Sequence, residues 1–146
     1  MLGVNKGMDM DIGKALLVAN SNKRIYAYYN ANPANKETND CVIRSLCTAY
    51  NKQWLDVSNE LYAIAIEQYT VLSSKEVYEA YLSKNNATYI KTMEKTKRVT
   101  AGEFALKHKQ GTYILRLAHH LTVCVSGVIL DTWDCTDKMC YCAWEI

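Results

Sequence analysis

Residues 39–45 read Asn39-Asp40-Cys41-Val42-Ile43-Arg44-Ser45, and the interpretation of the whole chain starts from this stretch. Asn39 and Asp40 are both favourable N-caps, so a helix is expected to begin at Cys41. The apolar residues that follow have the spacing of one helical face: Ile43, Leu46, Cys47 and Tyr50. In the first turn of a helix, unpaired N–H groups and partial positive charge lower the pKa of a thiol. Cys41 is therefore the candidate nucleophile among six cysteines.

The last third of the chain has the period of β-strands. Apolar or alternating runs cover residues 112–118, 120–126, 128–133 and 139–144. Between the second and third runs, Ser126-Gly127 has the composition of a two-residue hairpin loop. Such a loop pairs Val125 with Val128 and fixes the register of both strands.

That register selects one histidine and one carboxylate. Counting back from the loop, four residues fall on one face of the sheet: His120, Thr122, Asp131 and Trp133. Asp131 is the diagonal neighbour of His120, roughly 7–8 Å away at the backbone. A carboxylate at that distance can orient an imidazole and support its protonated form. His119 and Asp134 fall on the opposite face, so His120 is the candidate base and Asp131 the candidate third member.

The remaining segments indicate an α+β fold with the helices first and an antiparallel sheet last. Further helices are expected over residues 54–69, from the capping box Ser73-Ser74-Lys75-Glu76, and from Thr100-Ala101-Gly102-Glu103 to about Lys109. Residues 25–29 resemble a short strand. Residues 1–24 are expected to be a weakly structured extension, which leaves one domain over residues 25–146.

Composition bounds the function. The 146 residues fit a single core, and the net charge of +2 gives no reason to expect a nucleic-acid or membrane partner. No signal peptide or membrane-length apolar run is visible in the sequence, so the cysteines are expected to be free thiols in a reducing, cytoplasmic compartment.

The motifs Asn39-Asp40-Cys41-Val42-Ile43-Arg44-Ser45, His120-Leu121-Thr122-Val123 and Asp131-Thr132-Trp133-Asp134 resemble small papain-like cysteine peptidase domains of bacteriophages and bacteria. The similarity covers roughly residues 26–146. It implies a cysteine that starts the central helix, with the histidine and the aspartate on adjacent strands. It also implies Asn35 as an oxyanion donor, where the family often has a Gln about six residues before the cysteine. Val42 departs from the family, because larger relatives often carry glycine or tryptophan there.

The resemblance implies a thiol-dependent hydrolase that acts on a peptide or protein substrate, without cofactor or metal, in the cytoplasm of a phage host. Transamidation and deamidation use the same triad. The alternative is a non-catalytic phage protein that binds or inhibits a host component.

Three structural alternatives stay open. Asp131 could pair with Arg44 instead of His120. Zinc could bind Cys135, Cys140 and Cys142, although their spacing is not a usual finger pattern. The tyrosines of residues 26–29 could stack on nucleic-acid bases, although no basic stripe accompanies them.

Overall fold

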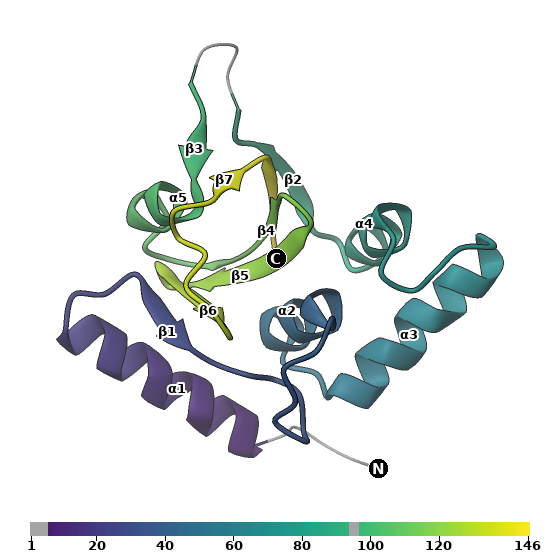
Figure 1. Cartoon of the computed structure of the whole chain (residues 1–146), viewed down its shortest axis with the longest axis horizontal. Helices are drawn as coiled ribbons and strands as arrows, with labels where there is room; N and C mark the ends of the chain where they lie inside the picture. The colour runs from purple at the N-terminus through teal and green to yellow at the C-terminus, as the bar shows by residue number, and fades with distance from the viewer. Residues whose placement is uncertain (1–5, 94–96) are drawn as a thin grey trace.

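The computed structural model describes residues 6–93 and 97–146, excluding the side chains of residues 6–10. The helices of these residues are α1 (Lys6–Ser21), α2 (Cys41–Tyr50), α3 (Trp54–Glu67), α4 (Lys75–Lys84) and α5 (Ala101–Lys107). The strands are β1 (Tyr26–Tyr28), β2 (Thr88–Lys91), β3 (Val99–Thr100), β4 (Thr112–Leu117), β5 (His120–Val125), β6 (Val128–Asp131), β7 (Met139–Cys140) and β8 (Cys142–Glu145). Figure 1 shows this arrangement along the chain. The α+β class expected from the sequence is confirmed.

The main sheet has six strands in the order β1-β6-β5-β4-β8-β2. It is mixed, because β1 runs parallel to β6 while the other neighbours are antiparallel. The expectation of a purely antiparallel C-terminal sheet is therefore wrong at this edge. The physical reason is the path of the chain, because four helices, α2 to α5, separate β1 from β6 in the sequence. Contacts across this edge join distant residues, such as the hydrogen bond from Tyr29 N to Asp131 O at 2.9 Å.

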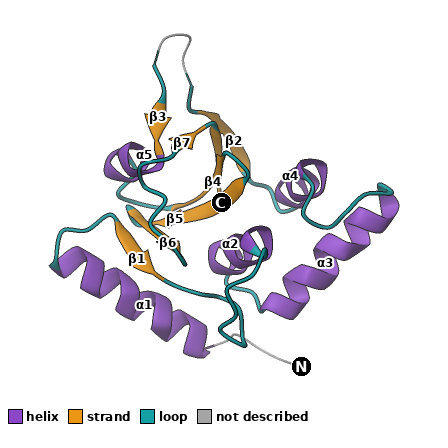
Figure 2. Cartoon of the chain, in the orientation of Figure 1, coloured by secondary structure: helices purple, strands orange, loops and turns teal. Residues whose placement is uncertain are grey.

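The sheet buries both of its faces, because helices lie on both sides of it (Figure 2). On one side, α1 to α4 share a core with alternate sheet residues such as Ile114, Val123 and Val128. On the other side, α5 packs its Phe104 against a second core. The sheet residues of that second core alternate with the first set: Leu115, Cys124 and Ile129. This explains why the strands are apolar on both faces.

The hairpin between β5 and β6 has the predicted register, with Val125 opposite Val128 and Val123 opposite Leu130. Ser126 and Gly127 both have positive φ, at 51° and 78°, as a type I′ turn requires. A side chain at Gly127 would also come within 3.3 Å of the Ala105 carbonyl oxygen. The turn therefore sits tightly against α5 and fixes the two strands that carry His120 and Asp131.

The N-terminal segment differs from the expectation of weak structure, because Lys6–Ser21 form α1. Its inner residues are Ile12, Ala15, Leu16 and Ala19, which pack against the larger core. These four positions have the i, i+3, i+4, i+7 spacing of a helical face. The stripe is short and made largely of small residues, which is why the sequence pattern was weak. The helix covers β1 at the sheet edge (Figure 1).

The structure agrees with the predicted starts of the helices better than with the predicted side-chain caps. α2 begins at Cys41 as expected, and Thr100 caps α5 by accepting a hydrogen bond from Glu103 N at 3.1 Å. Ser74 occupies the N-cap of α4 without a cap hydrogen bond. The short strands β2 and β3 were not expected, since two to four residues carry too little periodicity to be recognised, and the strand expected over residues 139–144 is divided into β7 and β8.

Candidate active site

Cys41 is the first residue of α2, and the N-terminus of this helix is not closed by a side chain. Asp40 occupies the N-cap position but makes no side-chain cap hydrogen bond. Its buried carboxylate instead accepts hydrogen bonds from Arg44 Nε at 2.7 Å, Trp54 Nε1 at 2.9 Å and Asn32 Nδ2 at 3.0 Å. Because the first N–H groups of a helix have no intrahelical acceptor, those next to Cys41 stay available to a ligand.

The pKa of Cys41 is lowered even though the residue is half-buried. Burial by itself raises this pKa, but hydrogen bonds from the His120 side chain and from the Leu121 backbone lower it, as do the charges of His120 and Arg44. Each of these interactions favours the thiolate over the thiol. Cys41 and His120, at the start of β5, both line one cavity, as a nucleophile and its base must.

His120 is held by Asp131 across the β5–β6 hairpin. Its Nε2 lies 2.6 Å from Asp131 Oδ2, and the aspartate is 2% exposed. Burial lowers the pKa of His120, but the hydrogen bond to Asp131, supported by contacts with Cys135 and Cys41, raises it to about 11. The pKa of Asp131 is raised by burial and lowered more strongly by His120 and Thr122, so that it falls below its ordinary value. Imidazolium beside carboxylate is therefore the stable state of this pair.

Asp131 is fixed by further contacts on both carboxylate oxygens. Thr122 Oγ1 donates to Oδ2 at 2.6 Å, and the Thr132 backbone N–H donates to Oδ1 at 2.7 Å. Arg44 Nη1 donates to Oδ1 at 3.1 Å. The alternative pairing of Asp131 with Arg44 is thus present together with the pairing to His120, since the carboxylate has two oxygens.

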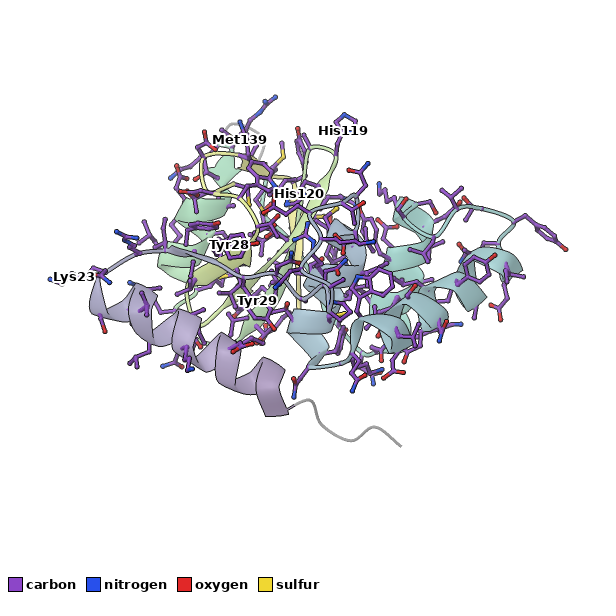
Figure 3. The ribbon with its side chains drawn as sticks, turned by 60° about the horizontal axis from the view of Figure 1, so that its bottom comes forward. Lys23, Tyr28, Tyr29, His119, His120 and Met139 are labelled. Atoms are coloured by element: carbon purple, nitrogen blue, oxygen red, sulfur yellow. The ribbon has the colours of Figure 1, made fainter. Side chains whose placement is uncertain are left out.

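A cavity of about 760 Å³ opens over Cys41 and His120. Its lining includes Thr38 and Asn39 before α2, His119 in the β4–β5 turn, and Thr132 and Trp133 after β6. The Trp133 ring lies 5.0 Å from the His120 ring, centroid to centroid. In Figure 3, His120 lies toward the middle of the molecule and His119 at its edge, in agreement with the exposed side chain of His119. His119 lies in the β4–β5 turn and lines the same cavity, rather than on the opposite face of the sheet as expected, but it is His120 that contacts Asp131.

Asn35 is not brought into this cavity. It is exposed in the loop after β1, with φ of 54°, and it lines two other cavities bordered by α1 and the residues around Tyr29. The expected oxyanion role of Asn35 is therefore not supported by its position. The Pro33–Asn35 turn, closed by a hydrogen bond from Asn35 N to Asn32 O at 3.0 Å, directs the chain away before it returns at Asn39. Asn39, in contrast, is one of the residues that line the cavity over Cys41 and His120.

The other five cysteines differ from Cys41 in both burial and acidity. All five are buried thiols without disulfides: Cys47, Cys124, Cys135, Cys140 and Cys142. Burial raises the pKa of each, to about 12 for Cys47, Cys124 and Cys140. Cys41 alone combines access to solvent with a lowered pKa.

One group of potential metal ligands occurs among the described residues: His120, Asp131 and Cys135, with ligand atoms within 4.8 Å of one another. Two features oppose a cation there. Arg44 already places a positive charge on Asp131, and burial keeps Cys135 protonated. Cys140 and Cys142 are not in this group, so the described residues do not bring the ligand atoms of Cys135, Cys140 and Cys142 together, and Cys140 donates to the Cys142 carbonyl oxygen at 3.4 Å.

Sequence reasoning missed several residues of the site. Cys135 lies 3.7 Å from Asp131 Oδ2, and Trp54 and Asn32 hold Asp40. Lys75, Tyr78 and Arg116 line the cavity from α4 and β4. Arg116 could have been found from the sequence, because it is the one charged residue within the apolar run of residues 112–118.

No protein-family model, curated protein or solved structure matches the chain. Within residues 6–93 and 97–146, no helix has both the length and the apolar character needed to cross a membrane.

Proposed function

We propose that the protein is a papain-like, thiol-dependent hydrolase of a peptide, amide or isopeptide bond, with Cys41 as nucleophile, His120 as acid–base group and Asp131 as its partner. The observation that carries the proposal is the position of Cys41, at an open helix N-terminus, in the same cavity as His120, whose ring is held by buried Asp131. A structural cysteine needs none of these features. Cys135 also contacts Asp131 and His120, but it is buried and its pKa is raised, and the other four cysteines are buried thiols. The order of the three residues along the sequence is also that of the papain-like family.

The reaction begins from a Cys41 thiolate beside a His120 imidazolium. The thiolate sulfur attacks the carbonyl carbon, and the electron pair of the C=O bond moves to the oxygen. When the tetrahedral intermediate collapses, the C–N bond breaks and His120 gives its proton to the leaving amine. Neutral His120 then takes a proton from water, whose oxygen attacks the thioester. The acid is released, and the thiolate–imidazolium pair returns. An amine that replaces water in the last step gives transamidation.

The oxyanion is stabilised by the N-terminus of α2. The Cys41 backbone N–H is positioned for it, because the Asp40 carboxylate is held by Arg44, Trp54 and Asn32 and does not compete for the helix N–H groups. Asn39 in the cavity lining supplies a second donor in place of Asn35. Such donors act on the charge that develops in the transition state.

Selective alkylation tests the proposal. Iodoacetamide at about pH 6 should modify Cys41, because a lowered pKa keeps a larger thiolate fraction than an ordinary thiol of pKa about 8.5. Peptide mass mapping locates the label, and Cys41→Ser should abolish it. Modification of Cys47 or Cys135 to an equal extent would contradict the assignment of the nucleophile.

The same experiment separates the enzyme from the alternative, a non-catalytic phage protein that binds a host component on the same fold. The rate of alkylation is measured between about pH 4 and 10, which gives the pKa of Cys41 directly. A value near 8.5 would support the binding protein over the hydrolase.

A further inference from the structure

The cavity has two ends that are lined by different kinds of residues and lie on opposite sides of β5. β5, which carries His120, lies between β6 and β4. On the β6 side the lining consists of Thr132 and Trp133. On the β4 side it consists of Arg116 and of three residues at the start of α4: Ser73, Lys75 and Tyr78. A substrate that lies across Cys41 therefore contacts both ends.

The α4 end is positively charged. Lys75 and Arg116 both line it, and among the described residues the lining of the cavity includes no aspartate or glutamate. Glu79, which is not in that lining, pairs with both cations, at 2.6 Å from Arg116 and 3.9 Å from Lys75. One carboxylate cannot neutralise two cations, so this end keeps an excess of positive charge facing the cavity. Arg44, the other cation of the lining, is already paired with Asp40 and Asp131.

Arg116 is held in place before any ligand arrives. Its side chain is 20% exposed and its guanidinium lies 5.4 Å from the centroid of the Trp144 ring. Glu79 holds one of its terminal nitrogens at 2.6 Å, and Tyr78 lines the same end of the cavity. A fixed guanidinium loses little conformational entropy when it binds a carboxylate. Lys75, whose side chain is 63% exposed, is the mobile partner of this pair.

We propose that the α4 end of the cavity, formed by Lys75 and Arg116, selects substrates that carry a carboxylate on that side of the bond attacked by Cys41. The inference rests on the proposed function, because it concerns the specificity of the same site. The carboxylate comes either from an acidic side chain or from the C-terminus of a short substrate. Both sources have the chemistry that a lysine and a fixed arginine recognise.

The test uses peptide vinyl sulfones that alkylate Cys41 and carry glutamate, glutamine or lysine at successive positions. At one position, the glutamate probes should react about threefold to tenfold faster than the glutamine probes. High salt should reduce the reaction rate of the glutamate probes. Probes that end in a free carboxylate or in an amide distinguish the C-terminal source from the side-chain source. Equal rates for glutamate, glutamine and lysine probes at every position would overturn the inference.

Two matched variants identify the residues. Lys75→Glu should reverse the ratio of the glutamate and lysine probe rates. Lys84→Glu is the control, because Lys84 ends the same helix, is 61% exposed and likewise lies 3.9 Å from a glutamate, but does not line the cavity. The ratio for Lys84→Glu should equal that of the wild type. A reversal in both variants would show that only the net charge matters and would overturn the assignment to the α4 end.

The outcomes also distinguish this inference from the proposed function. If no probe and no iodoacetamide modifies Cys41 of the wild-type protein, the hydrolase proposal itself fails. If Cys41 reacts with all probes at rates that do not depend on their charge, the hydrolase proposal stands and the carboxylate preference fails.

Discussion

At the scale of single residues, the acidity of Cys41 depends on a carboxylate that never touches it. Asp131 holds His120 as the imidazolium, and the imidazolium beside Cys41 stabilises the thiolate. Two groups with opposite shifts of pKa therefore support each other. His120 stays protonated above its ordinary pKa, and Cys41 stays ionised below its own.

Asp131→Asn should raise the pKa of Cys41. Without the carboxylate charge the pKa of His120 falls, the ring becomes neutral near pH 7, and the thiolate loses its counter-charge. We expect the alkylation rate of Cys41 at about pH 6 to fall about tenfold or more, since one pKa unit changes the thiolate fraction tenfold. Asp134→Asn is the control, because exposed Asp134 contacts Thr136 rather than His120. An unchanged alkylation profile in Asp131→Asn would contradict the role of the carboxylate.

The two asparagines before Cys41 should differ in their effect on catalysis. Asn39→Ala should lower kcat on a cleaved amide substrate by about 10²–10³, as the loss of an oxyanion donor does. Asn35→Gly should leave kcat unchanged, and glycine tolerates the positive φ of that position. Alkylation by iodoacetamide, which forms no oxyanion, serves as the internal reference for a correctly folded Cys41. A larger loss in Asn35→Gly would restore the assignment made from the sequence.

At the scale of elements, the sequence predicted what local patterns determine. The β5–β6 register follows from a two-residue loop and period-2 alternation, and it correctly placed His120 and Asp131 together. The start of α2 was also predicted. The role of Asp40 was not, because Arg44, Trp54 and Asn32 attract its carboxylate away from the cap position, and only the tertiary structure brings two of these close.

The sequence did not predict the parallel pairing of β1 with β6 or the packing of α1, for the same reason. Both depend on contacts between the two ends of the chain. Arg116 and Lys75 likewise meet only because α4 packs beside β4 and β8. No window of sequence contains both partners.

Adjacent residues of α1 give a direct test of its packing. Leu16→Gln should lower the free energy of unfolding by about 1–3 kcal/mol, because Leu16 packs against the core. Leu17→Gln should change it by less than about 0.5 kcal/mol, because Leu17 is 68% exposed. Urea unfolding followed by circular dichroism measures both values. Equal stabilities of the two variants would indicate that residues 1–24 are the weakly structured extension expected from the sequence.

At the scale of the whole molecule, Arg44 joins the helical part to the sheet. Its guanidinium connects Asp40, at the start of α2, with Asp131, at the end of β6. All three side chains are buried, so each charge depends on the others for its solvation. The same residues that shape the candidate active site therefore also hold the two layers together.

Arg44→Ala should destabilise the protein by about 3–5 kcal/mol, because it leaves the buried Asp40 carboxylate without a cation and Asp131 with His120 alone. The comparison is Lys52→Ala, which removes a half-exposed ion pair with Glu60 at 3.1 Å and should cost about 0–1 kcal/mol. Urea midpoints and slopes for both variants measure the difference. Similar losses would mean that the Arg44 pairs contribute no more than a surface contact.

The position of Cys41 at the N-terminus of α2 has a consequence for folding. The residues that activate its sulfur are contributed by β5 and β6, and the Arg44–Asp131 pair beside it spans 87 positions of sequence. Closing so long a loop is slow compared with the formation of a helix. During refolding, α2 can form long before the sulfur becomes acidic. The rate at which quenched pulses of an alkylating reagent modify Cys41 during refolding should therefore report when the last long-range contacts form.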